Sequence, residues 1–258
     1  MNAILDALGR MPVGEAVAWM LVENLLLFAF ALMLGRLLVL AYRSRQVGPP
    51  PLPVEAREVA LAFSCVGLNT FVTLVGWWLW RLGVIVVRRD TGVRAWLDAA
   101  VLLLVMDLAM YVTHRIAHLP WVYPVVHATH HHYDRPRPLD LFVLNPLEVL
   151  GFGGLWLTVI WAYSSSWLGM VVYLALNLIF GVIGHLGVEP FPRSWAARPV
   201  LRHLGTSTFH AGHHHDRGGN FGFYTLIWDR LFGTLHQDCG APFGIQAAES
   251  PASVGGGP

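Results

Sequence analysis

The stretch AWLDAAVLLLVMDLAMYVTHRIAH, residues 95–118, decides the fold, because an apolar run leads directly into two histidines. The run over 95–113 approaches the roughly 20 apolar residues that a membrane-spanning helix needs. His114 and His118 follow with a four-residue step, which puts both rings on one face if the helix continues. The stretch therefore predicts a transmembrane helix that presents a pair of imidazoles at one membrane surface.

The composition of the whole chain favours a membrane protein. Of its 258 residues, 55% are hydrophobic and only 13% are charged, against about 25% charged residues in soluble domains. The net charge of +1 gives no reason to expect a nucleic-acid partner. Cys65 lies in an apolar run and Cys239 in a polar tail, so we expect no disulfide framework and polar parts that face a reducing cytoplasm. The N-terminus shows no pattern of a cleaved signal peptide.

Hydropathy predicts an all-α, polytopic membrane helix bundle of four or five spans. The candidate spans are roughly 16–41, 59–80, 95–113, 147–163 and 167–184. The last two are joined by Ser164–Ser166 and should form a tight helical hairpin. Polar residues within the spans are interpreted as contacts between helices; these are Glu23, Asn24, Asn69 and Asn177. We expect a single domain with N-terminal membrane helices over 1–94, a membrane and catalytic region over 95–239, and a disordered tail over 240–258.

The arginines predict the orientation of the bundle. Three groups follow the first, third and fifth spans and so share one side, whereas a fourth group follows the second span. Positive residues favour the cytoplasmic side of a membrane, so the histidine clusters are expected to face the cytoplasm. All 17 basic residues are arginine, and we expect an integral protein of a bacterial inner membrane. The three groups are Arg43 and Arg45; Arg115, Arg135 and Arg137; and Arg193, Arg198 and Arg202, and the fourth is Arg81, Arg88 and Arg89.

All 13 histidines lie between His114 and His236, and most of them fall in three boxes. The first is the pair His114 and His118. The second is HATHHH over 127–132 and the third is HAGHHH over 210–215, each with ring positions at i, i+3 and i+4 that converge on one side of a helix. Clustered neutral imidazoles would leave many buried nitrogens without partners unless they bind metal. Because eight ligands exceed one coordination sphere, the pattern predicts two metal ions of a kind that imidazole suits, namely Fe, Zn, Cu or Ni.

Three further polar residues are candidate catalytic residues. Asp107 and Tyr111 lie on the same helical stripe as His114. A carboxylate there could accept a hydrogen bond from a ligating imidazole and orient it, although Asp107 could instead pair with Arg115 or Tyr111. Glu148 opens the fourth predicted span and is expected to pair with Arg135 or Arg137 beneath the site.

The order and spacing of the boxes resemble the fatty acid hydroxylase and sterol desaturase superfamily of membrane di-iron enzymes. The resemblance covers roughly residues 95–236 and extends to Asp107-x3-Tyr111-x2-His114-Arg115 and to the segment Asn220-Phe-Gly with Trp228-Asp-Arg-Leu-Phe-Gly-Thr234. Asn145-Pro-Leu-Glu148 resembles an H-P-x-E element of the family, with asparagine in place of histidine. Residues 1–94 carry no motif that matches the family.

The resemblance implies a set of metal ligands, namely His114, His118, His127, His130, His131, His210, His213 and His214. His185 resembles a further family histidine, and we also expect it to bind metal, although it could instead be a helix-end residue bonded to a carbonyl. For His132, His215 and His203 a role outside the metal site is favoured. His236 is expected to be solvated.

The resemblance implies a membrane-bound enzyme that uses two iron ions and O2 to hydroxylate a lipid, with zinc as a substitute metal. The chain contains no G-x-G-x-x-G motif and no cysteine cluster, so electrons would come from a separate ferredoxin or b-type cytochrome with its reductase. A lipid or sterol desaturase of the same superfamily is an alternative, and a divalent-metal transporter or metal-binding membrane protein is an alternative of another class. A zinc hydrolase is disfavoured, since no H-E-x-x-H is present. The lipid substrate stays open among sterol, fatty acyl chain, carotenoid and ether lipid.

Overall fold

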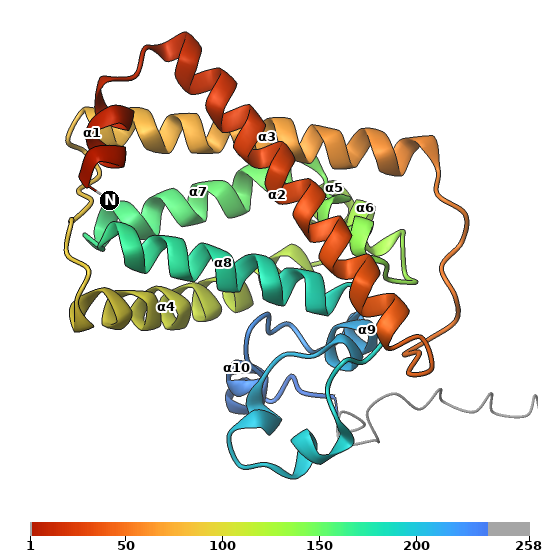
Figure 1. The fold of residues 1–258 in the computed structure, drawn as a ribbon. Helices are drawn as coiled ribbons and strands as arrows, with labels where there is room; N and C mark the ends of the chain where they lie inside the picture. The colour runs from red at the N-terminus through yellow and green to blue at the C-terminus, as the bar shows by residue number, and fades with distance from the viewer. Residues whose placement is uncertain (1, 237–258) are drawn as a thin grey trace, which may run out of the picture.

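The computed structural model describes residues 2–236 and is helical, with no strand in that range (Figure 1). The predicted tail over 240–258 and Cys239 lie outside the described residues. Four helices are long and apolar enough to cross a membrane, which confirms the all-α bundle; these are α2 (Val13–Ala41), α3 (Ala56–Arg81), α4 (Val93–Ala117) and α8 (Trp167–Gly184). The fourth predicted span forms α7 (Pro146–Ala162), which is apolar but has only 17 residues.

The five helices close a ring through their contacts. Helix α2 packs against α3, α3 against α7, α7 against α4, α4 against α8, and α8 returns to α2. Apolar side chains fill the inside of the ring, and large apolar side chains on the outside of α2, α3 and α4 remain exposed. A bundle with an apolar exterior matches a protein whose solvent is lipid.

The predicted tight hairpin of the last two spans is wrong. Helices α7 and α8 are joined by residues 163–166 and share one stack of rings, Trp156 on Tyr173 at 5.0 Å between centroids. They pack mainly against other helices, α7 against α3 and α8 against α4. The short linker reverses the chain, but the ring arrangement separates the two helices along most of their length.

The two ends of the bundle differ in character. At one end, α1 (Asn2–Arg10) lies beside the end of α3, where Trp77 Nε1 donates to the Leu8 carbonyl at 2.9 Å. At the other end α2, α4 and α8 all finish, and the remaining short elements gather there and alongside the last turns of α4 (Figure 1). We call this second region the cap, and it comprises α5 (Tyr123–Val126), α6 (Ala128–His131), η1 (Pro138–Phe142), η2 (Arg193–Ala197), η3 (Leu201–His203), α9 (Ser207–His215) and α10 (Ile227–Phe232).

Close packing fixes the cap against the bundle. A Cβ on Gly35 of α2 would lie 2.5 Å from Pro138, so glycine permits η1 to approach that helix. Arg137 forms an ion pair with the buried Glu58 at the start of α3. Arg45, just after α2, donates to the carbonyls of Pro190 and Phe191. These contacts join the connections that carry the second and third histidine boxes to the same end of the bundle.

Candidate metal centre

Nine histidines converge in two groups at the capped end of the bundle. Within each group, one ring nitrogen from every histidine lies within 4.8 Å of the others. The first group contains five histidines: His114, His118, His127, His131 and His213. The second contains four: His130, His185, His210 and His214. These nine are the residues that the sequence predicted as ligands.

Each of the two H-x-x-H-H boxes contributes to both groups. In the second box, His127 and His131 belong to the first group and His130 to the second. In the third box the division is reversed, since His210 and His214 belong to the second group and His213 to the first. Residues i and i+4 thus serve one group and residue i+3 the other, so the three rings on one side of each box are divided between two sites.

Local structure sets the direction of both boxes. The second box is a single turn, α6, which follows α5 with His127 between them. The third box lies on α9, where the Thr206 side chain caps the start of the helix by accepting from the Phe209 amide. The buried Glu189 accepts from the amide and the hydroxyl of Thr208 at 2.9 and 2.6 Å. Two independent contacts therefore fix where α9 begins and which way its histidines point.

Hydrogen bonds from outside the groups fix the tautomers of several rings. Nδ1 of His114 lies 2.9 Å from the Phe221 carbonyl, Nδ1 of His213 lies 2.7 Å from the Gly219 carbonyl, and Nδ1 of His185 lies 2.8 Å from the Gly181 carbonyl. A carbonyl can only accept, so each Nδ1 carries the proton and donates it. The Nε2 lone pair of each of these neutral rings is therefore available for a metal.

The inward nitrogens have the spacing that ligands of one metal ion would have. Nε2 atoms of neighbouring rings are 3.0–3.4 Å apart in both groups, as in His114 to His127 at 3.1 Å and His210 to His185 at 3.1 Å. Metal–nitrogen bonds of about 2.1 Å that meet at about 90° or about 109° place neighbouring nitrogens about 3.0 or about 3.4 Å apart. The buried Nε2 of His118 has no hydrogen-bond partner among the described residues. The residues present therefore fit one metal ion in each group.

Burial keeps these rings neutral. Removal from water lowers the pKa of His118 to about 3 and that of His185 to about 4. Burial and the neighbouring imidazoles hold the pKa of His131 and His214 far below the usual range. A neutral ring is the form that binds a metal.

Glu148 has a different partner from the one predicted. It does not pair with Arg135 or Arg137; its Oε1 lies 2.6 Å from Nδ1 of His127, and both side chains are buried. Arg137 pairs with Glu58 instead, and Arg135 donates to the Pro50 carbonyl. A carboxylate behind an imidazole fixes its orientation and raises its basicity as a ligand.

The structure also explains Asn145, where the sequence departs from the H-P-x-E element. Its side-chain oxygen accepts from the Leu147 amide and caps α7, and its Nδ2 donates to the Val125 carbonyl. These two bonds join the start of α7 to the second box and place Glu148 beside His127.

Asp107 and Tyr111 do not contact the imidazoles, so the prediction that Asp107 orients a ligand is wrong. The Asp107 carboxylate accepts from the Tyr224 and Thr225 amides, the Thr225 hydroxyl and Trp228 Nε1, and it pairs with neither Arg115 nor Tyr111. The Tyr111 hydroxyl lies 3.0 Å from that of Thr234, and its ring stacks on Phe232. Both residues hold the last part of the cap against α4.

The remaining histidines lie outside both groups. His132 and His215 are exposed, as expected for residues that follow the last convergent position of each box. His203 contacts Arg202. His236, predicted to be solvated, is only partly exposed; its ring lies 3.5 Å from Asp216, and its amide donates to Asn220.

Two features of the site were absent from the sequence prediction. The turn at Gly218-Gly219-Asn220 supplies the carbonyl that fixes His213, and Asn220 adopts a left-handed conformation with φ of 58°. Asparagine tolerates that region better than most residues, so the Gly-Gly-Asn run was an available signal. The Tyr123 ring contacts His118 and His131 at 5.5 and 5.8 Å between centroids. No pattern marked Tyr123, because its role depends on the path of the chain between two boxes.

A small cavity adjoins the second group. It is lined by His185 and His210 together with Phe180, Phe209 and Phe223. Its volume of about 10 Å³ is room for about one water-sized molecule.

Comparison with known proteins identifies the family. The profile described as fatty acid hydroxylase matches residues 99–234, which is more than half of the chain and includes all nine grouped histidines. The chain belongs to the fatty acid hydroxylase family. The match confirms the resemblance inferred from the boxes.

Several curated relatives of this chain are named as enzymes that act on lipids. A cholesterol 25-hydroxylase-like protein of Danio rerio is 27% identical over 191 residues, which are 68% of this chain and 73% of the relative. Methylsterol monooxygenase 2-2 of Arabidopsis thaliana is 28% identical over 134 residues, 51% of this chain and 49% of the relative. Very-long-chain aldehyde decarbonylase GL1-1 of Oryza sativa subsp. indica is 32% identical over 132 residues, 48% of this chain and 21% of the relative. The chain thus spans about half of the plant monooxygenase and a fifth of the decarbonylase, and the comparison with solved structures found no match.

Proposed function

We propose that this chain is a membrane-bound, non-haem di-iron oxygenase that hydroxylates a lipid with O2 and electrons from a separate protein. The observation that carries the proposal is the pair of imidazole groups, one of five rings and one of four, at the end of a membrane bundle. Imidazole sites accept several metals; the family and the relatives named as hydroxylases and monooxygenases favour iron.

Bound iron would supply the O2-dependent oxidation of a C–H bond, which amino-acid side chains cannot perform. The nine histidines would hold the two ions as neutral ligands. Glu148 and the carbonyls of Gly219, Phe221 and Gly181 orient four of those rings. Burial of the site excludes water, and the cavity beside His185 and His210 is where we place the reacting part of the substrate.

The lipid would come from the bilayer, and the substrate class extends over fatty acyl chains, sterols and related lipids. We propose that the histidines face the cytoplasm of a bacterial cell, because the arginine groups that follow α2, α4 and α8 lie at the same end as the site. A separate ferredoxin or b-type cytochrome with its reductase would deliver electrons at that face.

Two alternatives remain distinct from this proposal. Desaturation begins with the same hydrogen abstraction as hydroxylation, so the same site could remove two hydrogens. A metal transporter is less consistent with the structure, because transporters bind their ions near the middle of the membrane. Here the histidines lie at the ends of α4 and α8 and in the cap.

The test is lipid analysis of a deletion strain complemented by three forms of the gene. Wild-type protein should restore a lipid that is heavier by one oxygen atom than its precursor. His131→Ala, which removes a ring of the first group, should not restore it, whereas His132→Ala, which changes the exposed neighbour, should. A product lighter by two hydrogens would indicate a desaturase, and a lipid profile unchanged by deletion would contradict the proposal.

A further inference from the structure

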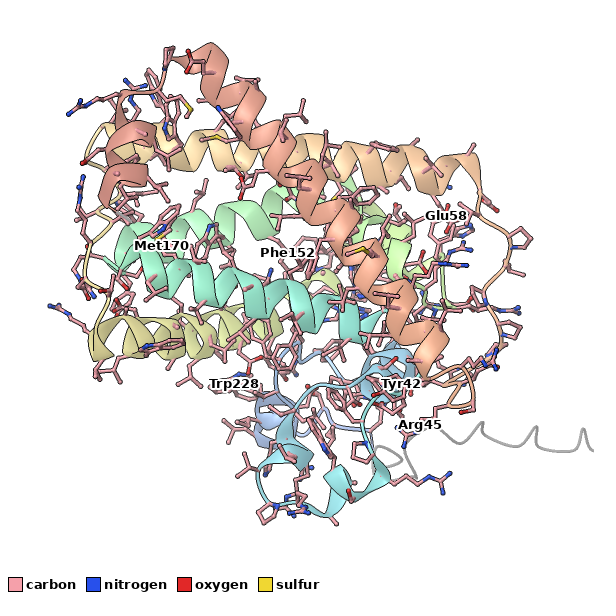
Figure 2. The ribbon with its side chains drawn as sticks, viewed as in Figure 1. Tyr42, Arg45, Glu58, Phe152, Met170 and Trp228 are labelled. Carbon is pink, nitrogen blue, oxygen red and sulfur yellow. The ribbon has the colours of Figure 1, made fainter. Side chains whose placement is uncertain are left out.

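The short helix α10 is fixed to the side of a membrane-spanning helix. The Asp107 carboxylate on α4 accepts from Trp228 Nε1 of α10 at 2.9 Å and from the Tyr224 amide just before it at 3.0 Å. One turn further along α4, the Tyr111 ring stacks on Phe232 with 5.5 Å between centroids and 15° between planes. Helix α10 therefore lies beside α4 over at least the turn from Asp107 to Tyr111; Figure 2 labels Trp228 where the two meet.

This contact lies well before the end of α4. Asp107 precedes the last residue of the helix, Ala117, by ten positions, which is about 15 Å at 1.5 Å per residue. The 25 residues of α4 span about 37 Å, only a little more than the roughly 30 Å of hydrocarbon in a bilayer. If α4 crosses the membrane, the level of Asp107 falls within the hydrocarbon, and α10 lies at the same level.

The outer face of α10 is apolar. Trp228 and the buried Asp229 face inward, whereas Ile227 and Leu231, one helical turn apart, are 42% and 67% exposed. Phe232 is 49% exposed beyond its stack on Tyr111. We call these three outward residues, Ile227, Leu231 and Phe232, the α10 surface.

The α10 surface continues the lipid-facing side of α4. Leu104, Leu108 and Val112, which flank the contact with α10 along that helix, are 55%, 37% and 42% exposed. Large apolar side chains grouped on a surface mark a contact with another apolar phase. Arg230, the exposed charged residue of α10, directs its guanidinium back to the cap, where Nη2 lies 3.5 Å from the Arg202 carbonyl.

We infer that α10 is a membrane-embedded element of the cap, with the α10 surface in contact with the acyl chains of the lipid. In this arrangement the cap surrounds part of α4 within the bilayer, and α10 shields Asp107 from lipid in place of a further spanning helix. The chain segment that supplies the Gly219 and Phe221 carbonyls to His213 and His114 leads directly into α10. The bilayer would thus hold in place the segment that orients the metal site. The inference does not depend on which reaction the site performs.

Spin-label accessibility in lipid nanodiscs tests the inference. The parent carries Cys239→Ser and keeps Cys65, which is buried at 3% exposure, so the parent itself measures any background labelling. Nitroxides are placed at Leu231→Cys and Ile227→Cys on the α10 surface, at Leu104→Cys on α4 as a lipid standard, and at Asp216→Cys as a cap residue in water. Asp216 has a side chain that is 68% exposed.

The ratio of collision rates with O2 to those with a water-soluble nickel chelate rises with depth in lipid. Positions 231 and 227 should give ratios that approach that of position 104 and exceed that of position 216. Ratios equal to that of position 216 would overturn the inference. Low collision rates with both reagents would also overturn it, because they would mean that protein, such as a second copy of the chain, covers α10. Two independent positions on one face guard against a variant that fails to fold.

Discussion

The two histidine groups differ in how firmly they are held. In the first group, three of the five rings are bonded from outside, by Glu148 to His127 and by backbone carbonyls to His114 and His213. In the second group one ring, that of His185, donates to a carbonyl; among residues 2–236, Nδ1 of His214 has no partner, and the same is true of Nδ1 of His131 in the first group. The second group also has one ring fewer and adjoins a small cavity.

This difference indicates that the two groups have different roles. A metal with five ligands, three of them on rings fixed from outside, would be held in one geometry, whereas a metal with four ligands beside a cavity would have room for another partner. We therefore interpret the first group as the fixed centre and the second as the centre nearer to the substrate. The two are joined through the boxes themselves, since neighbouring residues such as His130 and His131 serve different groups.

The largest effect should come from replacing one of two adjacent ligands. His130→Ala leaves three imidazoles in the second group, and His131→Ala leaves four in the first. Both should abolish lipid oxidation, but His130→Ala should release about one metal ion per chain, whereas His131→Ala should retain more of its metal. Elemental analysis of folded, monodisperse protein measures this, with His132→Ala as the control. Greater metal loss from His131→Ala would contradict the comparison.

Acid should destabilise the metal-free protein through both groups. The folded-state pKa of His185 is lowered by burial to about 4, so below pH 6.5 the unfolded chain binds more protons than the folded chain. Stability is therefore fully present above pH 6.5 and falls as the pH decreases toward 4. At pH 5.5 the loss is about 1.4 kcal/mol for a ring such as His185.

The measurement is the thermal midpoint of metal-free protein between pH 8 and pH 5. Because His118 of the first group also has its pKa lowered, to about 3, His185→Asn should remove only part of the dependence. A midpoint that does not change across this range would show that the rings are not buried as neutral groups.

Glu148→Gln tests whether the contact between Glu148 and His127 strengthens metal binding by the first group. Glutamine keeps the shape but removes the charge beside His127, and loss of such an outer partner typically lowers metal affinity by about 10–100-fold. Competition with a chelator should show that one of the two ions is weakened and the other is not. Asp98→Asn, which changes a buried carboxylate at the opposite end of the bundle, should leave both affinities unchanged.

The smallest effect on metal binding is expected for Asp107→Asn. The carboxylate contacts the cap and neither histidine group, so the change should lower stability, by about 1.5–3 kcal/mol for each weakened bond to the charged group. Metal content at saturation should stay at the wild-type value, measured alongside the thermal midpoint. A selective loss of one metal would restore Asp107 to a role at the site.

The positions of the membrane helices and the identity of the grouped histidines could be predicted from the sequence. Each predicted span agrees with a helix to within a few residues, as for 95–113 in α4, because an apolar run of that length has few other structures open to it in lipid. Box spacing drew attention to eight of the nine histidines, because side chains one turn apart on a helix face the same way, and the resemblance to the family added His185.

The division of the boxes and the role of Asp107 could not be predicted. Both depend on contacts between distant parts of the chain, such as Asp107 with Trp228, 121 positions apart. Spacing along one helix cannot reveal which distant loop covers it. Glu148 was recognised as part of the site, but its partner His127 depends on the turn that Asn145 holds between α7 and the second box.

Two metal ions should bind to separate imidazole groups in one chain. The most direct test is iron-57 loading of purified, detergent-solubilised protein, followed by elemental analysis and Mössbauer spectroscopy. We expect two iron ions per chain in two unequal environments, one from five histidines and one from four. A saturating content of one ion or none in folded protein would contradict it.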